Sequence, residues 1–268
     1  MAINLEQLNL NRFESIINFS SKNVVFCSEN DTIEEVIDKI VTTDHRRIPI
    51  VSKRGIVVGI ITKSDLLDAF LRREDFDEKI SNIMNRDLIL CEAHDSLEHV
   101  LQKFKISRRG GFPVVEKEKI VGMISERDFV NLLPNENIGI KVKNAMTKKP
   151  FVTQPNISIY DCLKMLVNTH YRRLPIVESV EGKGKLIGIV TATDLLKYIH
   201  EHDYDFETLD EELDKIMIKN VCTAGPEDDL ASAAKTMVSK KMGGLPVVNS
   251  IGDLEGIITE RDILEQID

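Results

Sequence analysis

Four times in this sequence, a glycine and two apolar residues are followed by a hydroxyl side chain and, three residues after the hydroxyl, by an aspartate. An ionised Asp carboxylate offers two acceptor oxygens and no donor. A hydroxyl at the start of a helix can join the free backbone N–H groups there in holding a phosphate. The four pairs are Thr62 with Asp65, Ser125 with Asp128, Thr191 with Asp194, and Thr259 with Asp262.

The same spacing has a purely structural interpretation, because a hydroxyl and an acid three residues apart form a helix capping box. Hydroxyl and carboxylate then satisfy unpaired N–H groups of the first turn, and no ligand is needed. Capping boxes favour Glu or Gln, and the shorter Asp side chain is expected to reach the backbone less well. This difference favours a ligand-binding role, but both interpretations stay open.

Each of these pairs follows a hydrophobic-Pro-hydrophobic-Val run, so the whole motif recurs about every 65 residues. A unit of that length is near the lower limit for an independent core, which predicts that the copies pack against one another. The prolines of the four runs are Pro49, Pro113, Pro175 and Pro246.

The copies alternate at three positions, which indicates that a two-repeat module was duplicated and kept the symmetry of a dimer. Before the proline, the odd copies have Arg46-Arg47 and Arg172-Arg173, and the even copies have Gly110-Gly111 and Gly243-Gly244. Before the aspartate, the odd copies have Ser64 and Thr193, and the even copies have Arg127 and Arg261.

The arginine pairs point to phosphate, because a planar guanidinium binds phosphate in a bidentate manner. The alternative is pairing with surface carboxylates, since the chain has 44 acidic residues. The glycine pairs have a simpler interpretation as helix C-caps that need positive φ.

Local patterns predict a β-α-β-β-α unit in every copy, and hence an α+β protein. The first strands are expected at 24–26, 88–90, 151–152 and 221–222, and the first helices begin after Thr32, Ser96, Ser158 and Asp229. Amphipathic leaders at 78–84, 142–146 and 213–217 join the copies. The expected boundaries are 1–22 for an N-terminal leader and 23–75, 76–133, 134–200 and 201–268 for repeats 1 to 4.

Composition excludes several classes of protein. The net charge of −9 argues against a nucleic-acid surface, no apolar run is long enough to span a bilayer, and the N-terminus lacks a secretory signal. The four cysteines form no Cys-x-x-Cys pair and predict a cytoplasmic protein with reduced thiols and no metal site. Cys27 and Cys91 align with Thr153 and Thr223 as small scaffold residues.

These motifs resemble the CBS domain, named after cystathionine β-synthase, in four consecutive copies that cover nearly the whole chain. The resemblance implies two Bateman modules, each a pair of repeats, in a flat pseudo-symmetric disc similar to the γ subunit of AMP-activated protein kinase and to stand-alone archaeal relatives. It also implies adenosine-containing ligands in clefts between paired domains.

The resemblance assigns a role to each group of residues. Asp65, Asp128, Asp194 and Asp262 would accept hydrogen bonds from the ribose cis-diol. Phosphate and ribose would be held by Thr62, Ser125, Thr191, Thr259, Ser64, Thr193, Arg46, Arg47, Arg172 and Arg173. The walls around adenine and ribose would come from Cys27, Cys91, Thr153, Thr223, Pro49, Pro113, Pro175 and Pro246.

The expected function is therefore a sensor that binds AMP, ADP or ATP, with no obligatory cofactor, and regulates a separate, unidentified protein. No Ser-His-Asp set, metal cluster or Gly-rich phosphate loop suggests an enzyme. A different adenosine ligand (S-adenosylmethionine or NAD) is the first alternative, and a ligand-free interaction module is the second. The symmetry allows a homodimer. The segment 201–214 has eight acidic residues and is expected to be a solvated helix or loop without a ligand.

Overall fold

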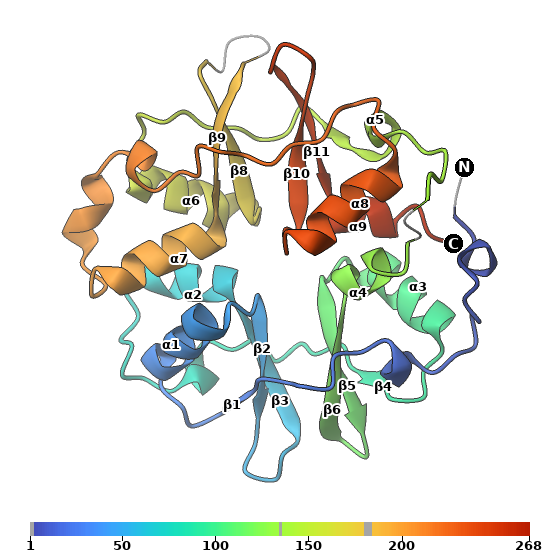
Figure 1. Cartoon of the computed structure of the whole chain (residues 1–268). Coiled ribbons are helices and arrows are strands. Elements are labelled where there is room, and N and C mark those ends of the chain that lie inside the picture. The colour runs from blue at the N-terminus through green and yellow to red at the C-terminus, as the bar shows by residue number, and fades with distance from the viewer. Residues whose placement is uncertain (1–2, 134–135, 180–183) are drawn as a thin grey trace. The chain divides into compact units, whose positions relative to one another are not determined.

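The computed structural model describes residues 3–133, 136–179 and 184–268 and contains four copies of one helix–hairpin–helix unit (Figure 1). Repeat 1 consists of β1 (Cys27–Ser28), α1 (Ile33–Thr43), β2 (Arg47–Val51), β3 (Val57–Thr62) and α2 (Lys63–Leu71). Repeat 2 consists of β4 (Cys91–Glu92), α3 (Leu97–Ser107), β5 (Gly111–Glu116), β6 (Lys119–Ser125) and α4 (Glu126–Val130). The α+β class and the four repeats are confirmed.

Repeats 3 and 4 follow the same plan. Repeat 3 consists of α6 (Ile159–Thr169), β8 (Arg173–Val177), β9 (Leu186–Thr191) and α7 (Ala192–Glu201). Repeat 4 consists of α8 (Leu230–Ser239), β10 (Gly244–Val248), β11 (Leu254–Thr259) and α9 (Glu260–Leu264). Between repeats 2 and 3 lie α5 (Val142–Ala145) and β7 (Thr147–Lys148), and β7 pairs with β11.

The first helix of each repeat starts where the sequence predicts. Thr32, Ser96, Ser158 and Asp229 each accept a hydrogen bond from a backbone N–H of the first turn. Three of these helices end in the left-handed region at Asp44, Arg108 and His170. Because the glycines found at positive φ in the described chain are Gly55, Gly139 and Gly252, the C-cap interpretation of the two glycine pairs is wrong.

The hairpin of each repeat is antiparallel and has a bulge one residue after the proline, as at Ile50/Val51 in β2. The first strand is shorter than expected and starts later. It is the two-residue β1 or β4 in repeats 1 and 2, and a single parallel bridge at Thr153 or Ala224 in repeats 3 and 4. The β-rich residues before these points contribute no ladder, because only a short segment can reach the second strand.

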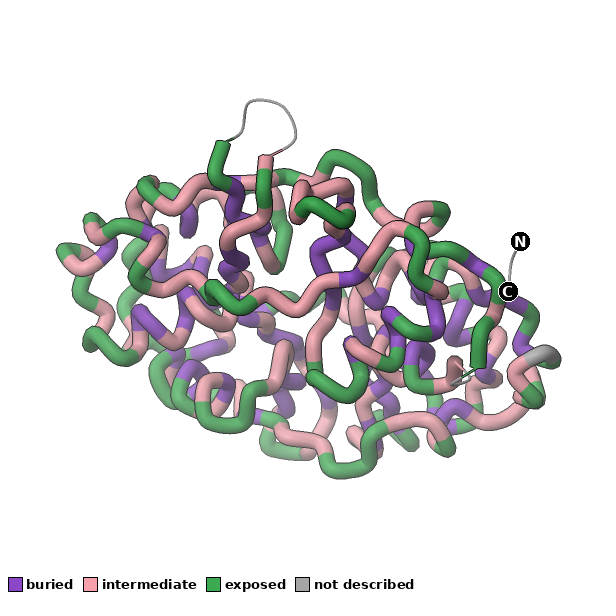
Figure 2. The backbone as a smooth tube through the Cα atoms, turned by 45° about the horizontal axis from the view of Figure 1, so that its top comes forward, coloured by how far each residue is buried: buried purple, intermediate pink, exposed green. Residues whose placement is uncertain are grey.

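The chain divides into two compact units and passes from one to the other four times. The even unit comprises Met1–Val24, Ile89–Pro150 and Cys222–Asp268, and the odd unit comprises Val25–Leu88 and Phe151–Val221. Helices α2 and α7 pack together in the odd unit, and α4 and α9 in the even unit. Buried residues recur along these helices and in the hairpin strands, and they alternate with exposed residues along the chain (Figure 2). Each unit thus unites the two repeats whose sequences are most alike.

The leader before each repeat packs on the neighbouring repeat rather than on its own. The first N–H of the first helix donates to a leader carbonyl in all four cases: Ile33 to Glu78, Leu97 to Glu14, Ile159 to Glu211, and Leu230 to Ile140, at 2.8–2.9 Å. Glycine is needed where the leader crosses the hairpin, since a Cβ on Gly256 would lie 2.6 Å from the Met146 sulfur.

The two ends of the chain are bonded to each other within the even unit. The N–H of Ile3 donates to the Gln266 carbonyl at 2.6 Å, and the N–H of Asp268 donates to the Ile3 carbonyl at 2.8 Å. Ile3, Leu5 and Ile267 are buried. None of the helices in the described ranges has the length and apolar composition that crossing a bilayer requires.

Candidate functional site

The Ser/Thr–Asp pair lies where the last strand of each hairpin enters the second helix. In repeat 1, Oδ2 of Asp65 accepts from the backbone N–H and the hydroxyl of Thr62, at 2.8 and 2.7 Å. The same two bonds occur in the other three repeats, with lengths of 2.6–2.8 Å. Every pair therefore forms a capping box.

The expectation that the shorter Asp reaches the backbone less well is wrong, because its carboxylate accepts from the backbone N–H at 2.7–2.8 Å in every repeat. Capping uses only Oδ2, however. Within the part of the chain that the structure describes, Oδ1 of Asp65, Asp128 and Asp194 accepts no hydrogen bond, and Oδ1 of Asp262 has only a 3.4 Å contact with the Thr147 hydroxyl. The second oxygen stays available to a ligand, so capping and ligand binding are compatible.

The arginines of the odd repeats lie beside these pairs. Arg47 is directly opposite Thr62 in the β2–β3 ladder, and Arg173 is opposite Thr191 in the β8–β9 ladder. Cα atoms of directly opposed residues in such ladders lie about 4.5–5.5 Å apart. Both arginines are half-buried, as is Arg46, while Arg172 is exposed. Two guanidinium-bearing strands thus flank two helix N-termini, an arrangement suited to an anion.

Glycines take the equivalent ladder positions in the even repeats, where Gly111 is opposite Ser125 and Gly244 is opposite Thr259. Burial raises the pKa of Asp128 and of Asp262 above the ordinary value, although bonds from Ser125 and Thr259 act in the other direction. The even repeats therefore have carboxylates whose burial raises their pKa, and glycine instead of arginine at the opposing ladder position.

Seven of the eight residues predicted as adenine walls are buried, either at the first strand or in the second strand, and Thr223 is half-buried. Cys27, Cys91 and Thr153 are at most 3% exposed, and the four prolines are buried as well. Burial raises the pKa of the Cys27 thiol to about 11, as expected for a packed scaffold cysteine. In repeat 4 the equivalent residue is Ala224, which pairs with Val247 as Thr153 pairs with Ile176, so the alignment of Thr223 was one residue off. The hydroxyl of Thr153 is buried without a hydrogen-bond partner among the described residues.

Within each unit, the second helices of its two repeats pack together, and the residue before the aspartate lies at this interface. Arg127 bonds to Glu260 at 2.8 Å, and Arg261 bonds to Glu126 at 2.6 Å, which gives two reciprocal ion pairs in the even unit. Both glutamates are 2% exposed. This explains the alternation at that position, since the odd repeats have no glutamate for an arginine to pair with.

In the odd unit, a lysine makes the polar contacts at the equivalent interface. The Nζ of Lys63 donates to the Thr193 hydroxyl and to Asp44, each at 2.9 Å, and the lysine is 6% exposed. Burial lowers its pKa, while the bond to Asp44 opposes that effect. Sequence analysis missed Lys63, Glu126 and Glu260. The signal was available, because the residue after the Ser or Thr is Glu in both even repeats and Lys or Ala in the odd ones.

Among the described residues, no three His, Cys, Asp or Glu side chains gather as a metal site. A family model of the CBS domain matches residues 16–72, 80–135, 142–201 and 213–268. The chain belongs to the CBS-domain family. All four CBS repeats found in the sequence are covered by these matches.

Two archaeal proteins are similar to this chain over most of its length. MJ1225 of Methanocaldococcus jannaschii is 29% identical over 91% of this chain and 95% of its own. Its crystal structure, described as that of a proposed archaeal homologue of the γ subunit of AMP-activated protein kinase, has a TM-score of 0.86 and covers 94% of this chain and 99% of the other, at 27% identity. A 33.4 kDa protein from Thermofilum pendens is 28% identical over 83% of this chain and 80% of its own.

A further crystal structure shares the fold of this CBS-domain chain. It is a protein from Pyrococcus horikoshii with 22% identity and a TM-score of 0.65, and the match covers 94% of this chain and 98% of the other.

Proposed function

We propose that this protein is a regulatory sensor that binds an adenine nucleotide, AMP, ADP or ATP, and transmits its occupancy to a separate protein in the cytoplasm. The observation that carries the proposal is the capping aspartate with one oxygen left over. A carboxylate held by a helix N-terminus and open on its other oxygen can accept from both hydroxyls of a ribose without disturbing the fold.

The odd repeats are the preferred sites for a phosphorylated ligand. Arg47 and Arg173 start the strands opposite Thr62 and Thr191, so cationic and hydroxyl groups lie together at each of these helix N-termini.

A ligand-free interaction module is the second candidate. It is favoured by the capping boxes and by the bond from Lys63 to Thr193, because both give fully structural roles to residues predicted as ligand contacts. The third candidate is a sensor for another adenosine ligand, S-adenosylmethionine or NAD. The methionine tail of S-adenosylmethionine needs a carboxylate partner, so an arginine pair favours a phosphorylated ligand.

Calorimetric titration of nucleotide-free protein with AMP, ADP, ATP, NAD and S-adenosylmethionine tests the proposal. We expect saturable binding of at least one adenine mononucleotide, and a thermal stabilisation that grows with ligand concentration, about 2.7 kcal/mol per site at a hundred times the dissociation constant. If all five ligands give neither heat nor stabilisation, the module is ligand-free and the sensor proposal is wrong.

A further inference from the structure

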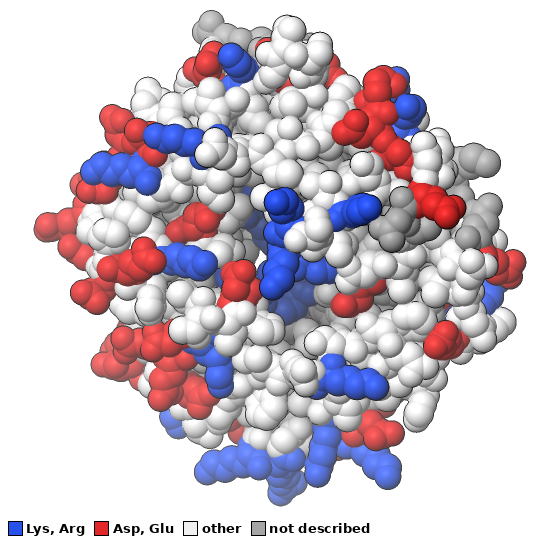
Figure 3. All heavy atoms as spheres, in the orientation of Figure 1, with Lys and Arg blue, Asp and Glu red and all other residues white. Residues whose placement is uncertain are grey.

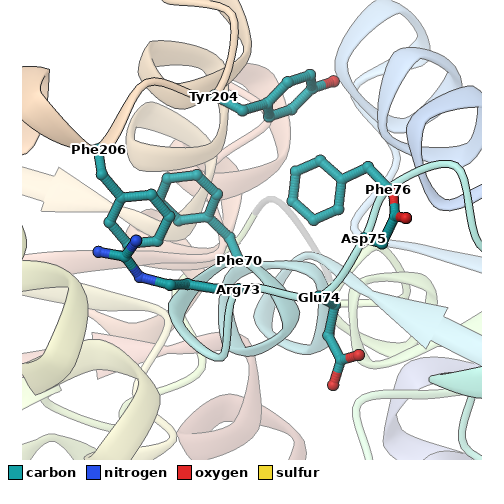
Figure 4. A pocket seen from close by; sticks show the side chains of 7 residues that line it. All are labelled: Phe70, Arg73, Glu74, Asp75, Phe76, Tyr204 and Phe206. Carbon is teal, nitrogen blue, oxygen red and sulfur yellow. The ribbon is translucent and has the colours of Figure 1, made fainter.

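An aromatic pocket of about 270 Å³ lies in the odd unit, at the opposite end of α2 from Asp65 (Figure 4). Its rings come from two segments, Phe70 and Phe76 from the end of repeat 1 and Tyr204 and Phe206 from the acidic segment after repeat 3. Phe70 and Phe206 stack with centroids 4.3 Å apart and planes inclined by 10°. Phe76 meets Tyr204 edge to face at 4.7 Å.

One ring of this pocket already holds a cation. The guanidinium carbon of Arg73 lies 4.2 Å from the centroid of Phe206, and the side chain reaches over the ring from outside (Figure 4). Arg73 is exposed, with a left-handed backbone at φ 58° just beyond the end of α2. A surface arginine is easily displaced, so the aromatic face that it covers can be offered to another cation.

The surroundings of the pocket are strongly acidic. Glu74 and Asp75 line it. Asp203 and Glu207 flank the two aromatic residues of the second segment and are exposed. Acidic side chains gather on this side of the molecule, over α1 and α7 (Figure 3). Burial, with Asp38, Glu34 and Asp203 nearby, raises the pKa of the Tyr204 phenol above its ordinary value. An anionic or nucleotide-like occupant would be repelled here.

We infer that this pocket docks an arginine or lysine side chain from a basic segment of a partner protein, and that Arg73 occupies the ring face until the partner arrives. Aromatic faces attract cations, and the rim carboxylates supply the opposite charge. Arginine fits best, because its flat guanidinium stacks on a ring while its stem covers apolar surface. The inference stands independently of nucleotide binding.

A tryptophan reporter makes the test direct, since the chain has no Trp. In the full-length Phe206→Trp variant, the fluorescence of that residue is titrated with the acetylated and amidated peptide Gly-Ser-Arg-Ser-Gly. The same peptide with citrulline in place of Arg has equal shape and no charge. We expect saturable quenching by the arginine peptide, and binding of the citrulline peptide weaker by about two- to fivefold, the range for an exposed cation–π contact.

Substitutions in the reporter background separate the contributions of the rim. Arg73→Gln removes the internal competitor and should tighten arginine-peptide binding by about two- to fivefold. Glu74→Gln combined with Asp203→Asn should weaken it. Arg54→Gln is the matched control, because Arg54 is an exposed arginine of the same unit, in the turn between β2 and β3, and does not line the pocket. It should leave the affinity within twofold.

Four results would overturn the inference. Equal binding of both peptides would mean that the pocket binds an uncharged, apolar group of the partner. Weaker binding after Arg73→Gln means that Arg73 is itself a contact for an anionic partner. Fluorescence that changes with protein concentration alone means that a second copy of the chain covers the pocket. Absence of saturable quenching in every variant means that the pocket is only a packing gap.

Discussion

Replacing Asp65 and Asp194 by Asn separates the capping role of these residues from ligand binding. The amide oxygen of Asn can take the place of Oδ2 and keep the bonds from the Thr62 or Thr191 N–H and hydroxyl. The NH₂ group then replaces the open Oδ1 and cannot accept from a ribose. Loss of a hydrogen bond to a charged group is worth about 1.5–3 kcal/mol, which corresponds to a roughly ten- to hundredfold loss of affinity at each site.

Stability should respond differently to Asn and to Ala. The Ala variants lose the cap, so their free energy of unfolding should fall by about 1 kcal/mol per site. The Asn variants keep the capping bonds and lose only the attraction between the carboxylate charge and the helix dipole, so their free energy of unfolding should fall by less. Calorimetry with AMP and 2′-deoxy-AMP, beside urea unfolding of the apo protein, gives both quantities. Asp68→Asn, one turn further along α2, is the control for charge. If the Asn variants bind AMP as tightly as the wild type, the aspartates only cap their helices.

Three further outcomes are expected. Changing Arg47 and Arg173 to Gln should weaken the binding of ATP and AMP far more than the binding of adenosine, and this loss of affinity should shrink as salt rises. An equal loss of adenosine affinity would show that these arginines hold the fold. Burial raises the folded-state pKa of Asp128, so ionisation of this carboxyl destabilises the fold as pH rises above the pKa of the unfolded state. The gain in unfolding free energy from Asp128→Asn should therefore grow from pH 4 to pH 7. A gain that does not change with pH would contradict this. Gly59→Ala should cost about 1–3 kcal/mol by overpacking against the Met84 side chain, measured by urea unfolding, and should cost much less in a Met84→Ala background; an equal cost in both backgrounds would show that the two residues do not meet.

Local signals in the sequence were sufficient for the elements and the helix starts. Thr32 begins α1 with Glu35 completing a capping box, and the Pro49 run and the Gly59 run pair as the predicted hairpin. Such features depend on residues close in the chain, where propensity and side-chain reach decide the outcome. The first strands were misplaced because their pairing depends on the bulged second strand, which the local pattern does not reveal.

The features that the sequence did not predict depend on contacts between segments that are distant in the chain. Arg127 looked like one half of an odd–even alternation, and its partner Glu260 lies 133 residues away. The acidic segment looked solvated, yet Phe206 stacks on Phe70. The exchange of leaders between repeats follows only from the structure, since each leader has the same amphipathic pattern whichever repeat it covers. Composition and periodicity carry no information on partner choice.

The bonding of the two chain ends has a consequence for the order of the repeats. Within the chain, the end of α2 is joined to the leader at Ile80 by a short covalent linker. Between repeat 4 and the leader at Ile16, backbone hydrogen bonds join Ile3 and Leu5 to residues 266–268. A circular permutant with these ends joined by a short linker and opened between two other repeats should keep the same packing.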